Sequence, residues 1–394
     1  MLKTKKVIRI LWMYDQPIEE TNGGTERASA LIMQGLEKLG YSCFGCLVIP
    51  IDESNPITYE KKEITDIYRF LKNNNIDIVI NQLAFDKRLL ERFFVSGGEK
   101  WKSEGGKLIS CMHFAPDMVT FSLHDAISEW KRLSLYRKLK RCVFIALSPL
   151  YYYRSRMRLK RGIKYCHDKS NKYVTLSQTH ISRILQIIGA NESEKLIAIN
   201  NPLSFQRSSS KDELLTKDKI VLSVSRLCEK QKKLSLILKA WKKIQSLPEV
   251  RDWKLIIVGD GADRPFYEKM IMKQDIVRVE LHGQKDPDYE YAKAAIFVSA
   301  SPSEGWGLTI TEAMQRACVP VVMNSSSVFS EMVNHRIDGI LIKNGDCTQM
   351  ANELVYLITN ADKRQNMACT GLQSCQRFNL SSTAMKWHKL ITTL

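Results

Sequence analysis

The strongest constraint on the fold of this chain is an alternation of strand-like and helix-like segments that occurs twice. In the first half, the apolar strand-like stretch 6–14 precedes a polar, glycine-containing loop and then 25–40, whose apolar residues recur at helical spacing. Thr25 is a candidate N-cap of that helix, and Gly40 is a candidate end. Alternation of this kind is typical of parallel sheets that are covered by helices.

The same alternation restarts after residue 202. Asn201-Pro202 and the polar run SSSKDE have the composition of a linker, and strand-like and helix-like segments follow them. The chain has 394 residues, which is too many for one ordinary core. The sequence therefore predicts an α/β fold with two Rossmann-like domains that face a cleft.

The chain is strongly basic. It has 59 Lys and Arg residues against 42 Asp and Glu residues, which gives a formal net charge of +17. Such a charge favours an anionic partner: a phosphate-bearing substrate, a nucleic acid or a membrane surface. Much of the surplus lies in residues 127–164, where twelve basic residues and only one acid, Glu129, alternate with aromatic and large apolar residues. This mixture suits an anionic lipid interface, and the alternative is a core helix with a solvated basic face.

Cysteine usage and hydropathy favour a cytosolic protein. The 10 cysteines show no framework spacing, and we expect them to be reduced. Cys43 and Cys46 form a CxxC pair, but the surrounding run SCFGCLVI is apolar and predicts a structural strand. The first residues also read as a strand rather than as a signal peptide, and no stretch of 18 apolar residues predicts a membrane span.

The most informative motif is SPSEGWGLTITEAM, residues 301–314. Gly305 and Gly307 allow a ligand to approach the backbone closely, and a helix that begins near Leu308 points its free N–H groups into the same loop. This arrangement suits a diphosphate. Glu304 precedes the helix and Glu312 lies about one turn inside it, so the two carboxylates can hold hydroxyls at either end of a ligand. The alternative is an ordinary turn with exposed acids.

A second cluster, SVSRLCEKQKK, follows another predicted strand. Arg226 ends the strand, and Lys230, Lys232 and Lys233 lie in the loop after it. Because ligands bind at the carboxyl ends of parallel strands, these cations are expected beside the first motif. Arg226 and one lysine would then stabilise a diphosphate leaving group. The alternative is a solvated basic loop.

Three further strand ends carry glycine or histidine. Gly259 and Gly261 lie in VGDG, and His282 and Gly283 lie in LHGQ, where backbone groups can bind a nucleobase edge. Gly24 ends NGG, at the first strand–helix turn of the N-terminal domain. We expect all five at the cleft.

The motifs resemble, in their order along the chain, those of the GT-B glycosyltransferases of family 4. They are NGG, SRL followed by basic residues, VGDG, HG and EGWGLTITEA. The resemblance is strong over 220–346 and looser over 1–200. It implies a retaining enzyme of the hexosyltransferase type that uses a nucleotide-diphosphate sugar. In that family Glu304 would lie beside the donor sugar and Glu312 would bind the ribose. The diphosphate would contact Gly305, Gly307, Leu308 and Arg226.

Two positions fit the family less simply. The family's lysine corresponds to Gln231, and one extra residue in the loop would align Lys232, with Lys230 and Lys233 as rivals. His113, which follows the strand-like run 107–112, resembles the histidine that the family places near the donor sugar and acceptor. A buried structural histidine is the alternative.

The resemblance also implies a division of labour between the domains. Residues 1–205 would bind the acceptor, residues 206–378 would bind the nucleotide sugar, and a helix over about 379–394 would pack back onto the first domain. The implied acceptor is a saccharide or a lipid-linked saccharide used in cell-surface polysaccharide assembly, at the inner face of the cell membrane. No metal, cofactor or protein nucleophile is implied, and the string Asp286-Pro287-Asp288 reads as a turn.

Two other classes remain open from the sequence. A GT-B nucleotide-sugar epimerase would have the same donor site without an acceptor. A basic nucleic-acid-binding protein would account for the charge, but it would leave the paired glutamates without a role. We therefore expect no nucleic acid among the partners.

Overall fold

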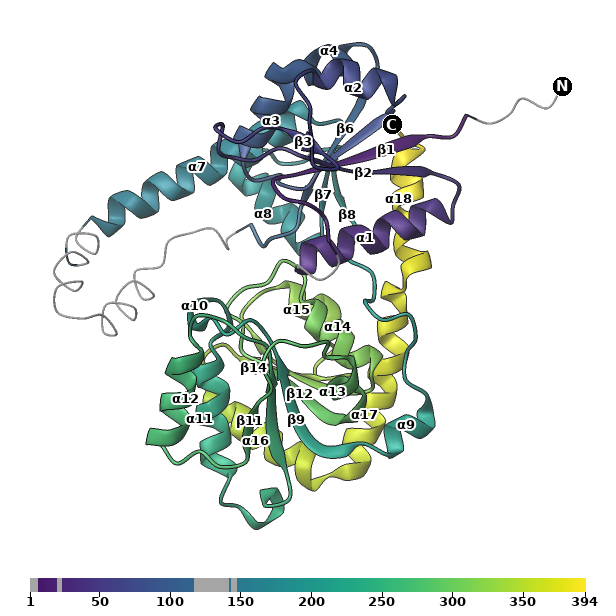
Figure 1. The fold of residues 1–394 in the computed structure, drawn as a ribbon. Coiled ribbons are helices and arrows are strands. Elements are labelled where there is room, and N and C mark those ends of the chain that lie inside the picture. Colours follow the sequence, from purple (N-terminus) through teal and green to yellow (C-terminus); the bar gives the residue numbers. More distant parts are fainter. Residues whose placement is uncertain (1–5, 20–22, 117–141, 143–146) are drawn as a thin grey trace. The chain divides into compact units, whose positions relative to one another are not determined.

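The computed structural model describes residues 6–19, 23–116, 142 and 147–394, and it divides into two compact units (Figure 1). One unit contains residues 1–201 and 380–394, and the other contains residues 202–379. The expected domains, 1–205 with a helix from about 379 and 206–378, differ from these units by one to four residues. In the described part of the chain, no helix is both long enough and apolar enough to cross a membrane.

The second unit is built on a parallel sheet with the strand order β11-β10-β9-β12-β13-β14. Because this is the doubly wound order, the direction of winding reverses between the first strand of the unit, β9, and the fourth, β12. Ligands bind at such a switch point, beyond the carboxyl ends of the strands. The strands are β9 (Asp218–Val224), β10 (Lys254–Val258), β11 (Val279–Leu281), β12 (Ala294–Ser299), β13 (Val319–Asn324) and β14 (Ile340–Lys343).

Helices cover this sheet and bury apolar stripes against it. In α11 (Leu234–Ile244), apolar residues at i, i+3, i+4 and i+7 form one face, and Trp241 within it is fully buried. The other helices are α9 (Lys211–Leu215), α10 (Glu229–Lys232), α12 (Arg264–Lys273), α13 (Asp288–Lys293), α14 (Leu308–Gln315), α15 (Val328–Met332), α16 (Cys347–Thr359) and α17 (Ala361–Ser374), with short turns η2 (Pro248–Val250) and η3 (Cys375–Phe378).

The polar run that reads as a linker forms part of helix α9. Ser210 caps this helix, because its side chain accepts a hydrogen bond from the Glu213 N–H at 3.2 Å. The Glu213 carboxylate in turn accepts from the Ser210 N–H at 2.7 Å. This reciprocal capping box nucleates a turn of helix that composition alone did not indicate. The second half of SSSKDE is therefore helical, and the run lies inside the second unit.

The first unit contains a sheet with the strand order β4-β3-β2-β1-β5-β6-β7-β8. The pairs from β2 to β8 across this sheet are parallel, whereas β3 pairs antiparallel with both β2 and β4. The strands are β1 (Arg9–Tyr14), β2 (Ser42–Val48), β3 (Thr58–Tyr59), β4 (Lys62–Glu63), β5 (Ile78–Asn81), β6 (Lys107–Met112), β7 (Lys172–Thr175) and β8 (Leu196–Ala198).

Helix α1 (Gly24–Glu37) begins two residues earlier than an N-cap at Thr25 would give. The residue before it is Gly23, so the expected N-cap at Thr25 is wrong. The other elements of this unit are α2 (Ile67–Asn73), α3 (Lys87–Phe93), η1 (Phe94–Gly98), α4 (Glu99–Ser103), α7 (Ser148–Lys169), α8 (Gln178–Ile188) and α18 (Leu380–Ile391).

The C-terminal helix α18 completes the core of the first unit. Its residues Trp387, Leu390 and Ile391 are buried in one apolar cluster with Ile10 and Trp12 of β1. Helix α1 packs beside it (Figure 1). The approach of these two helices is so close that a Cβ atom on Gly35 would lie 2.9 Å from that of Ala384. A helix at the far end of the sequence therefore belongs to the N-terminal sheet.

The CxxC pair lies within strand β2. Cys43 is aligned with Ile10 of β1, and Cys46 is aligned with Trp12. Burial raises the pKa of each thiol to about 12, so both are protonated at neutral pH. Both cysteines thus belong to a paired strand of the sheet, as the apolar context of the pair predicts.

The basic segment 127–164 is only partly described. Its residues up to 141, and 143–146, lie outside the described part of the chain, and helix α7 carries residues 148–164. The N-terminal half of α7 extends away from the sheet (Figure 1), and it exposes a run of three tyrosines, of which Tyr153 is 62% exposed. The other half buries Leu159 and Ile163, so α7 is a core helix along part of its length only.

Candidate functional site

An ion pair joins the two loops at the switch point of the second unit. Lys232, the last residue of α10, follows β9, and Glu304 lies in the loop after β12. The Lys232 Nζ lies 2.5 Å from Oε1 of Glu304, and the two side chains are 23% and 18% exposed. The two sequence motifs thus meet where a doubly wound sheet binds its ligand.

A buried carboxylate anchors the short helix that carries Lys232. Glu229 accepts hydrogen bonds from the Ser235 hydroxyl at 2.6 Å and from the Tyr267 hydroxyl at 3.1 Å. The Glu229 N–H donates to the Asp263 carboxylate at 2.7 Å. These contacts tie α10 to α11 and α12, and they fix the position from which Lys232 extends.

The backbone between α10 and α11 explains why Lys232 occupies this place. Lys233 separates the two helices and has a left-handed conformation with a φ of 49°. This turn separates Lys232, at the end of α10, from the start of α11. Of the three candidate lysines, Lys232 makes the ion pair with Glu304, whereas Lys230 is exposed.

Arg226 lies in the same loop, two residues after the end of β9, and its side chain is exposed. The backbone around it is tied to the end of β10, because the Leu227 N–H donates to the carbonyl of Asp260 at 2.9 Å. Gly259 and Gly261 permit this approach. A Cβ on Gly259 would lie 2.0 Å from the Ser225 carbonyl oxygen. These two glycines therefore serve the packing of the loops that surround the site.

The first turn of α14 lies in the same loop system. Gly307 precedes the helix with a φ of 107°, a conformation that favours glycine, and it offers no side chain to cap the N–H groups that follow. Gly305 and Gly307 are buried, and Leu308 is the first helical residue. The positive end of the α14 dipole and its N–H groups suit an anion. Glu312 lies in the next turn and is 2% exposed.

His282 and Gly283 follow β11 as expected. The imidazole Nε2 of His282 lies 2.8 Å from the Glu280 carboxylate, and its Nδ1 lies 3.0 Å from the Lys285 Nζ. Gly283, with a φ of 73°, accepts a hydrogen bond at its carbonyl from the Gly259 N–H at 2.8 Å. The ends of β10 and β11 are thereby joined, and the His282 ring takes part in side-chain contacts with charged neighbours.

In the first unit, His113 lies just beyond the end of β6 and is buried. Its Nε2 contacts the side-chain oxygen of Gln82, which follows β5 and also accepts from the Ser29 hydroxyl at 3.4 Å. The other ring nitrogen, Nδ1, is buried without a hydrogen-bond partner among the described residues. Desolvation lowers the pKa of His113 to about 4, so the ring is neutral at pH 7.

Gly24 is the first residue of α1, after β1, in the same unit. The buried carboxylate of Glu26 lies in the first turn of this helix and accepts from the Gln16 side chain. Gly24 and His113 thus follow the strands β1 and β6 of one sheet, while the other expected site residues belong to the second unit.

Sequence reasoning missed Glu229 and Gln82, which support the expected residues. Glu229 is a single acid within a basic loop, and only the fold brings Tyr267, far along the chain, to its carboxylate. Gln82 had a usable signal, because it directly follows a buried strand at the edge where ligands bind. Of the string 286–288, Asp286 and Pro287 precede α13 and Asp288 is its first residue, where it pairs with Arg316 at 2.5 Å.

The second unit thus places cations, a carboxylate and a helix N-terminus at the switch point of a Rossmann-like sheet, an arrangement that suits a phosphate-bearing ligand. Residues 204–373 match the family of group 1 glycosyl transferases. An uncharacterized glycosyltransferase of Haemophilus influenzae is 23% identical over 202 residues, and this match covers 51% of this chain and 56% of that relative.

Two further comparisons extend over nearly the whole chain. The amylovoran biosynthesis glycosyltransferase AmsD of Erwinia amylovora is 22% identical over 390 residues, which are 94% of this chain and 96% of AmsD. The crystal structure of Anabaena Alr3699/HepE in complex with UDP-glucose superimposes with a TM-score of 0.68 at 17% identity, over 98% of this chain and 100% of that chain. The segment 204–373 thus resembles the group 1 glycosyl transferases, and the whole chain has the GT-B fold, with two Rossmann-like units.

Proposed function

We propose that this protein is a retaining glycosyltransferase that moves a sugar from a nucleotide-diphosphate sugar to a saccharide or lipid-linked saccharide in cell-surface polysaccharide assembly. The observation that carries the proposal is the ion pair between Lys232 and Glu304 at the switch point of the second unit. It brings together a cation for phosphate and a carboxylate for sugar hydroxyls, the two chemistries that a nucleotide sugar requires.

The leaving diphosphate is the group that this unit would stabilise. As the bond between sugar and phosphate lengthens, negative charge develops on the phosphate oxygens. Fixed positive charge beside these phosphate oxygens would come from Arg226, Lys232 and the N-terminus of α14. Glu304 would hold the donor sugar, and the buried Glu312 would bind the ribose hydroxyls. In the retaining reaction the acceptor attacks from the face that the diphosphate leaves, so no protein nucleophile is needed.

The fixed cations also take the part that a divalent metal plays in other transferases. The positive charge at the proposed diphosphate site comes from side chains and from the helix dipole. We therefore propose a reaction that needs neither a metal ion nor a cofactor.

The names of the similar proteins support this substrate class. AmsD is a glycosyltransferase of amylovoran biosynthesis, and Alr3699/HepE was crystallised with UDP-glucose. By analogy, the second unit here would take a nucleotide sugar, and the first unit would take the acceptor. The neutral, buried His113 would lie near the transferred sugar. Because its Nε2 donates to the Gln82 side-chain oxygen, its Nδ1, which has no partner among the described residues, can accept a hydrogen bond.

The location that we propose is the cytoplasmic face of an anionic membrane. Helix α7 combines exposed tyrosines with basic residues, and peripheral attachment needs both apolar insertion and charge attraction. Each Lys or Arg near an anionic surface contributes about 1 kcal/mol. A lipid-linked acceptor would present its sugar at such a surface.

A donor screen tests the proposal. The purified protein is incubated with each of several UDP-, GDP- and ADP-sugars, and free nucleotide and sugar products are measured. We expect release of one nucleotide, with transfer of the sugar when an acceptor saccharide is present and the anomeric configuration retained. Release of UDP with a changed sugar configuration, without an acceptor, would indicate the epimerase instead. Binding to duplex DNA with a steep salt dependence and no sugar transfer would indicate the nucleic-acid-binding protein.

A further inference from the structure

A buried glutamine, Gln82, lies where three neighbouring strands of the first unit end. It directly follows β5, the strand between β1 and β6 in the sheet. Its N–H donates to the carbonyl of Met13 in β1 at 2.9 Å, and the next residue, Leu83, forms an antiparallel bridge with Met112 at the end of β6. The backbone around Gln82 is therefore held by both neighbouring strands, at the edge of the sheet where a Rossmann-like unit binds ligands.

The residue before Gln82 holds the turn of the chain at this point. The Leu83 N–H donates to the side-chain oxygen of Asn81 at 3.0 Å, a contact that is typical of a tight turn. The amide nitrogen of Asn81 donates to the Ser110 hydroxyl of β6 at 3.1 Å. Two consecutive buried amides therefore have different partners: Asn81 fixes the turn, and Gln82 contacts side chains.

The side-chain oxygen of Gln82 contacts side chains from two other elements. His113, the residue after β6, places its Nε2 against this oxygen, and the hydroxyl of Ser29 in α1 donates to the same oxygen at 3.4 Å. Gln82 and Ser29 are 2% and 1% exposed, so water does not compete for these contacts. Because an amide oxygen only accepts hydrogen bonds, each partner is a donor. Gln82 therefore presents an acceptor to the imidazole.

The contact with Gln82 determines which nitrogen of His113 carries a proton. A neutral imidazole has one N–H donor and one acceptor nitrogen, and the hydrogen bond made by one nitrogen fixes the state of the other. Burial lowers the pKa of His113 to about 4, so the ring is neutral at pH 7. Since Nε2 donates to Gln82, the single proton lies on Nε2 and Nδ1 is the acceptor.

The state of Nδ1 matters for a sugar, because a sugar hydroxyl can either donate or accept a hydrogen bond. A ring with the proton on Nδ1 would donate to the hydroxyl oxygen. A ring with the proton on Nε2 accepts from the hydroxyl instead, and this leaves the lone pairs of the hydroxyl oxygen free for other contacts. The tautomer of His113 therefore decides the direction of the hydrogen bond that the ring makes with a sugar.

We propose that Gln82 is a positioning residue for sugar transfer: it holds His113 in the tautomer with the proton on Nε2, so that Nδ1 accepts a hydrogen bond from a sugar hydroxyl. The proposal rests on the proposed function, which places His113 near the transferred sugar. Ser29 has a supporting part, because its hydroxyl holds the same amide oxygen. Gln82 acts through the imidazole and does not itself contact the substrate.

The test measures the tautomer by NMR and needs no turnover. The full chain is labelled with ¹⁵N in its seven histidines, and the ring signals of His113 are identified by their loss in His113→Gln. At pH 7 we expect a neutral ring with a protonated Nε2 and an unprotonated Nδ1. Gln82→Met removes the accepting oxygen at nearly equal size. The His113 signals should then shift toward the form with the proton on Nδ1, or toward a mixture of the two forms.

Gln82→Glu is the conservative variant, and it keeps the test decisive if Gln82→Met does not fold. It retains an accepting oxygen beside Nε2, so the tautomer should stay the same at about pH 8. Its carboxylate favours the charged ring, so an NMR titration should give a His113 pKa above about 4. Turnover at about pH 8 should fall about tenfold or more in Gln82→Met and should be higher in Gln82→Glu than in Gln82→Met.

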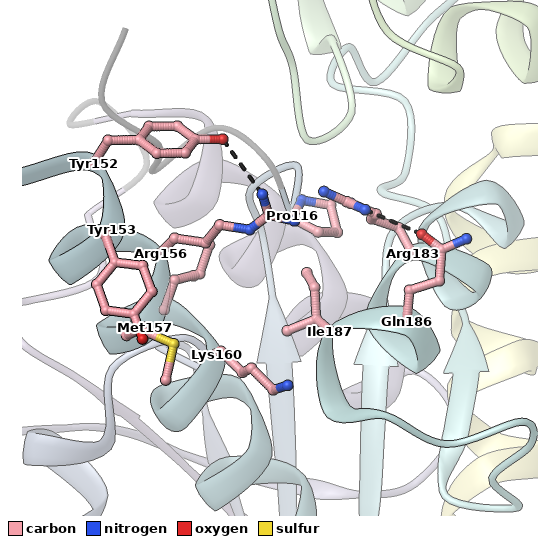
Figure 2. A pocket seen from close by; sticks show the side chains of 10 residues that line it. Pro116, Tyr152, Tyr153, Arg156, Met157, Lys160, Arg183, Gln186 and Ile187 are labelled. Carbon is pink, nitrogen blue, oxygen red and sulfur yellow. Dashed lines mark hydrogen bonds between the residues drawn. The ribbon is translucent and has the colours of Figure 1, made fainter. Parts of the chain in front are cut away.

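Gln186→Met is the matched control. Gln186 is an exposed glutamine of α8 whose side-chain oxygen also accepts from a basic side chain, Arg183, at 3.0 Å (Figure 2). It lines the pocket between α7 and α8, and neither Gln82 nor His113 lines that pocket. The same substitution at this position should leave the His113 signals, the His113 pKa and the turnover unchanged.

Three results would overturn the proposal: an unchanged His113 spectrum in Gln82→Met, a changed tautomer with normal turnover, or an unchanged His113 pKa in Gln82→Glu. A titration with UDP, which has no sugar, keeps this inference distinct from the proposed function. UDP binding depends on the second unit and should be the same in all variants. An unchanged protein that shows the expected tautomer and transfers no sugar from any donor would contradict the transferase and not the contact of Gln82 with the ring.

Discussion

The Nζ of Lys232 and the Oε1 of Glu304 lie 2.5 Å apart, although 72 residues separate them in the chain. Each residue lies in a loop that follows one of the two strands at the switch point, so the pair joins the loops on either side of that point. The carboxylate orients the ammonium group, and the buried contacts of Glu229 hold its helix in place. A donor phosphate would share this cation with Glu304.

The first prediction concerns Lys232. Lys232→Ala should lower the turnover number by ~10²–10³, because one fixed positive charge beside the leaving diphosphate is lost. Release of free nucleotide, measured at saturating donor and acceptor, checks this. Lys232→Arg keeps the charge and should retain more activity than Lys232→Ala.

Lys230→Ala is the matched control for this prediction. Lys230 is an exposed residue of the same short helix, and its replacement should keep near-normal turnover. Full activity in Lys232→Ala, with activity lost in Lys230→Ala or Lys233→Ala, would assign the phosphate contact to a neighbouring lysine.

The succession of strands along the chain and the main site motifs could be predicted from the sequence, because both depend on local patterns. Buried strands are apolar runs, and the loop around Glu304 combines glycines with a helix start. Lys232 was chosen from a one-residue shift against the family pattern, whereas its contact with Glu304 was visible only in the structure. The left-handed conformation of Lys233 is one that lysine rarely adopts and that no local pattern indicates. The capping box at Ser210 could have been predicted from the sequence, since its serine and glutamate are three residues apart.

Other parts of the fold could not be predicted, because they depend on contacts between distant residues. The strands β3 and β4 have two residues each, too few to show the alternation of apolar and polar residues that is typical of a strand. Gln82 supports His113 across 31 residues of sequence, and only the adjacency of β5 and β6 brings them together.

The second prediction concerns metal ions. Sugar transfer should continue at an unchanged rate in excess EDTA, because Arg226, Lys232 and the N-terminus of α14 supply the positive charge at the diphosphate. The measurement is the initial rate of nucleotide release with EDTA, and with added magnesium or manganese as the comparison. Activity that EDTA abolishes and either metal restores would contradict the proposed site.

The third prediction concerns His113 and pH. Its pKa is lowered to about 4 in the folded protein, whereas an unfolded histidine titrates near its ordinary value of 6.5. Between these values the unfolded state binds the proton and the folded state does not, so the free energy of unfolding falls as the pH falls from 6.5 to 4. The full loss from this group is on the order of 3 kcal/mol.

His113→Gln should remove that part of the pH dependence, because glutamine does not titrate. Denaturant unfolding at several pH values between about 7 and 4 measures the effect in both proteins. The other titrating groups are the same in both and provide the internal control. Parallel curves for the two proteins would show that the His113 ring is not held neutral.

The fourth prediction concerns membrane attachment. The full chain should float with liposomes that contain anionic lipid and should stay behind with neutral liposomes, because its attachment depends on attraction between exposed basic residues and the lipid charge. This attraction is screened beyond about 8 Å at physiological salt, so it acts only at the surface itself. Replacing five basic residues of α7 by serine should abolish flotation. These residues are Arg154, Arg156, Arg158, Lys160 and Arg161.

The matched control replaces five exposed lysines of α11 and α12 by serine and should float normally. These lysines are Lys239, Lys242, Lys243, Lys269 and Lys273. Equal recovery in the soluble fraction for all three proteins would reject the membrane proposal and would leave the donor site unaffected.

The position of α18 in the first unit has a consequence for synthesis on the ribosome. Domains generally fold as they emerge, N-terminal first. Here Trp387, Leu390 and Ile391 fill the cluster around β1, so the first sheet to emerge lacks part of its core until the last helix leaves the exit tunnel. The second unit, whose residues are contiguous, can finish first. One apolar face of the nascent N-terminal sheet therefore stays exposed until α18 has been synthesised. A chaperone that covers this face would prevent its aggregation during that time.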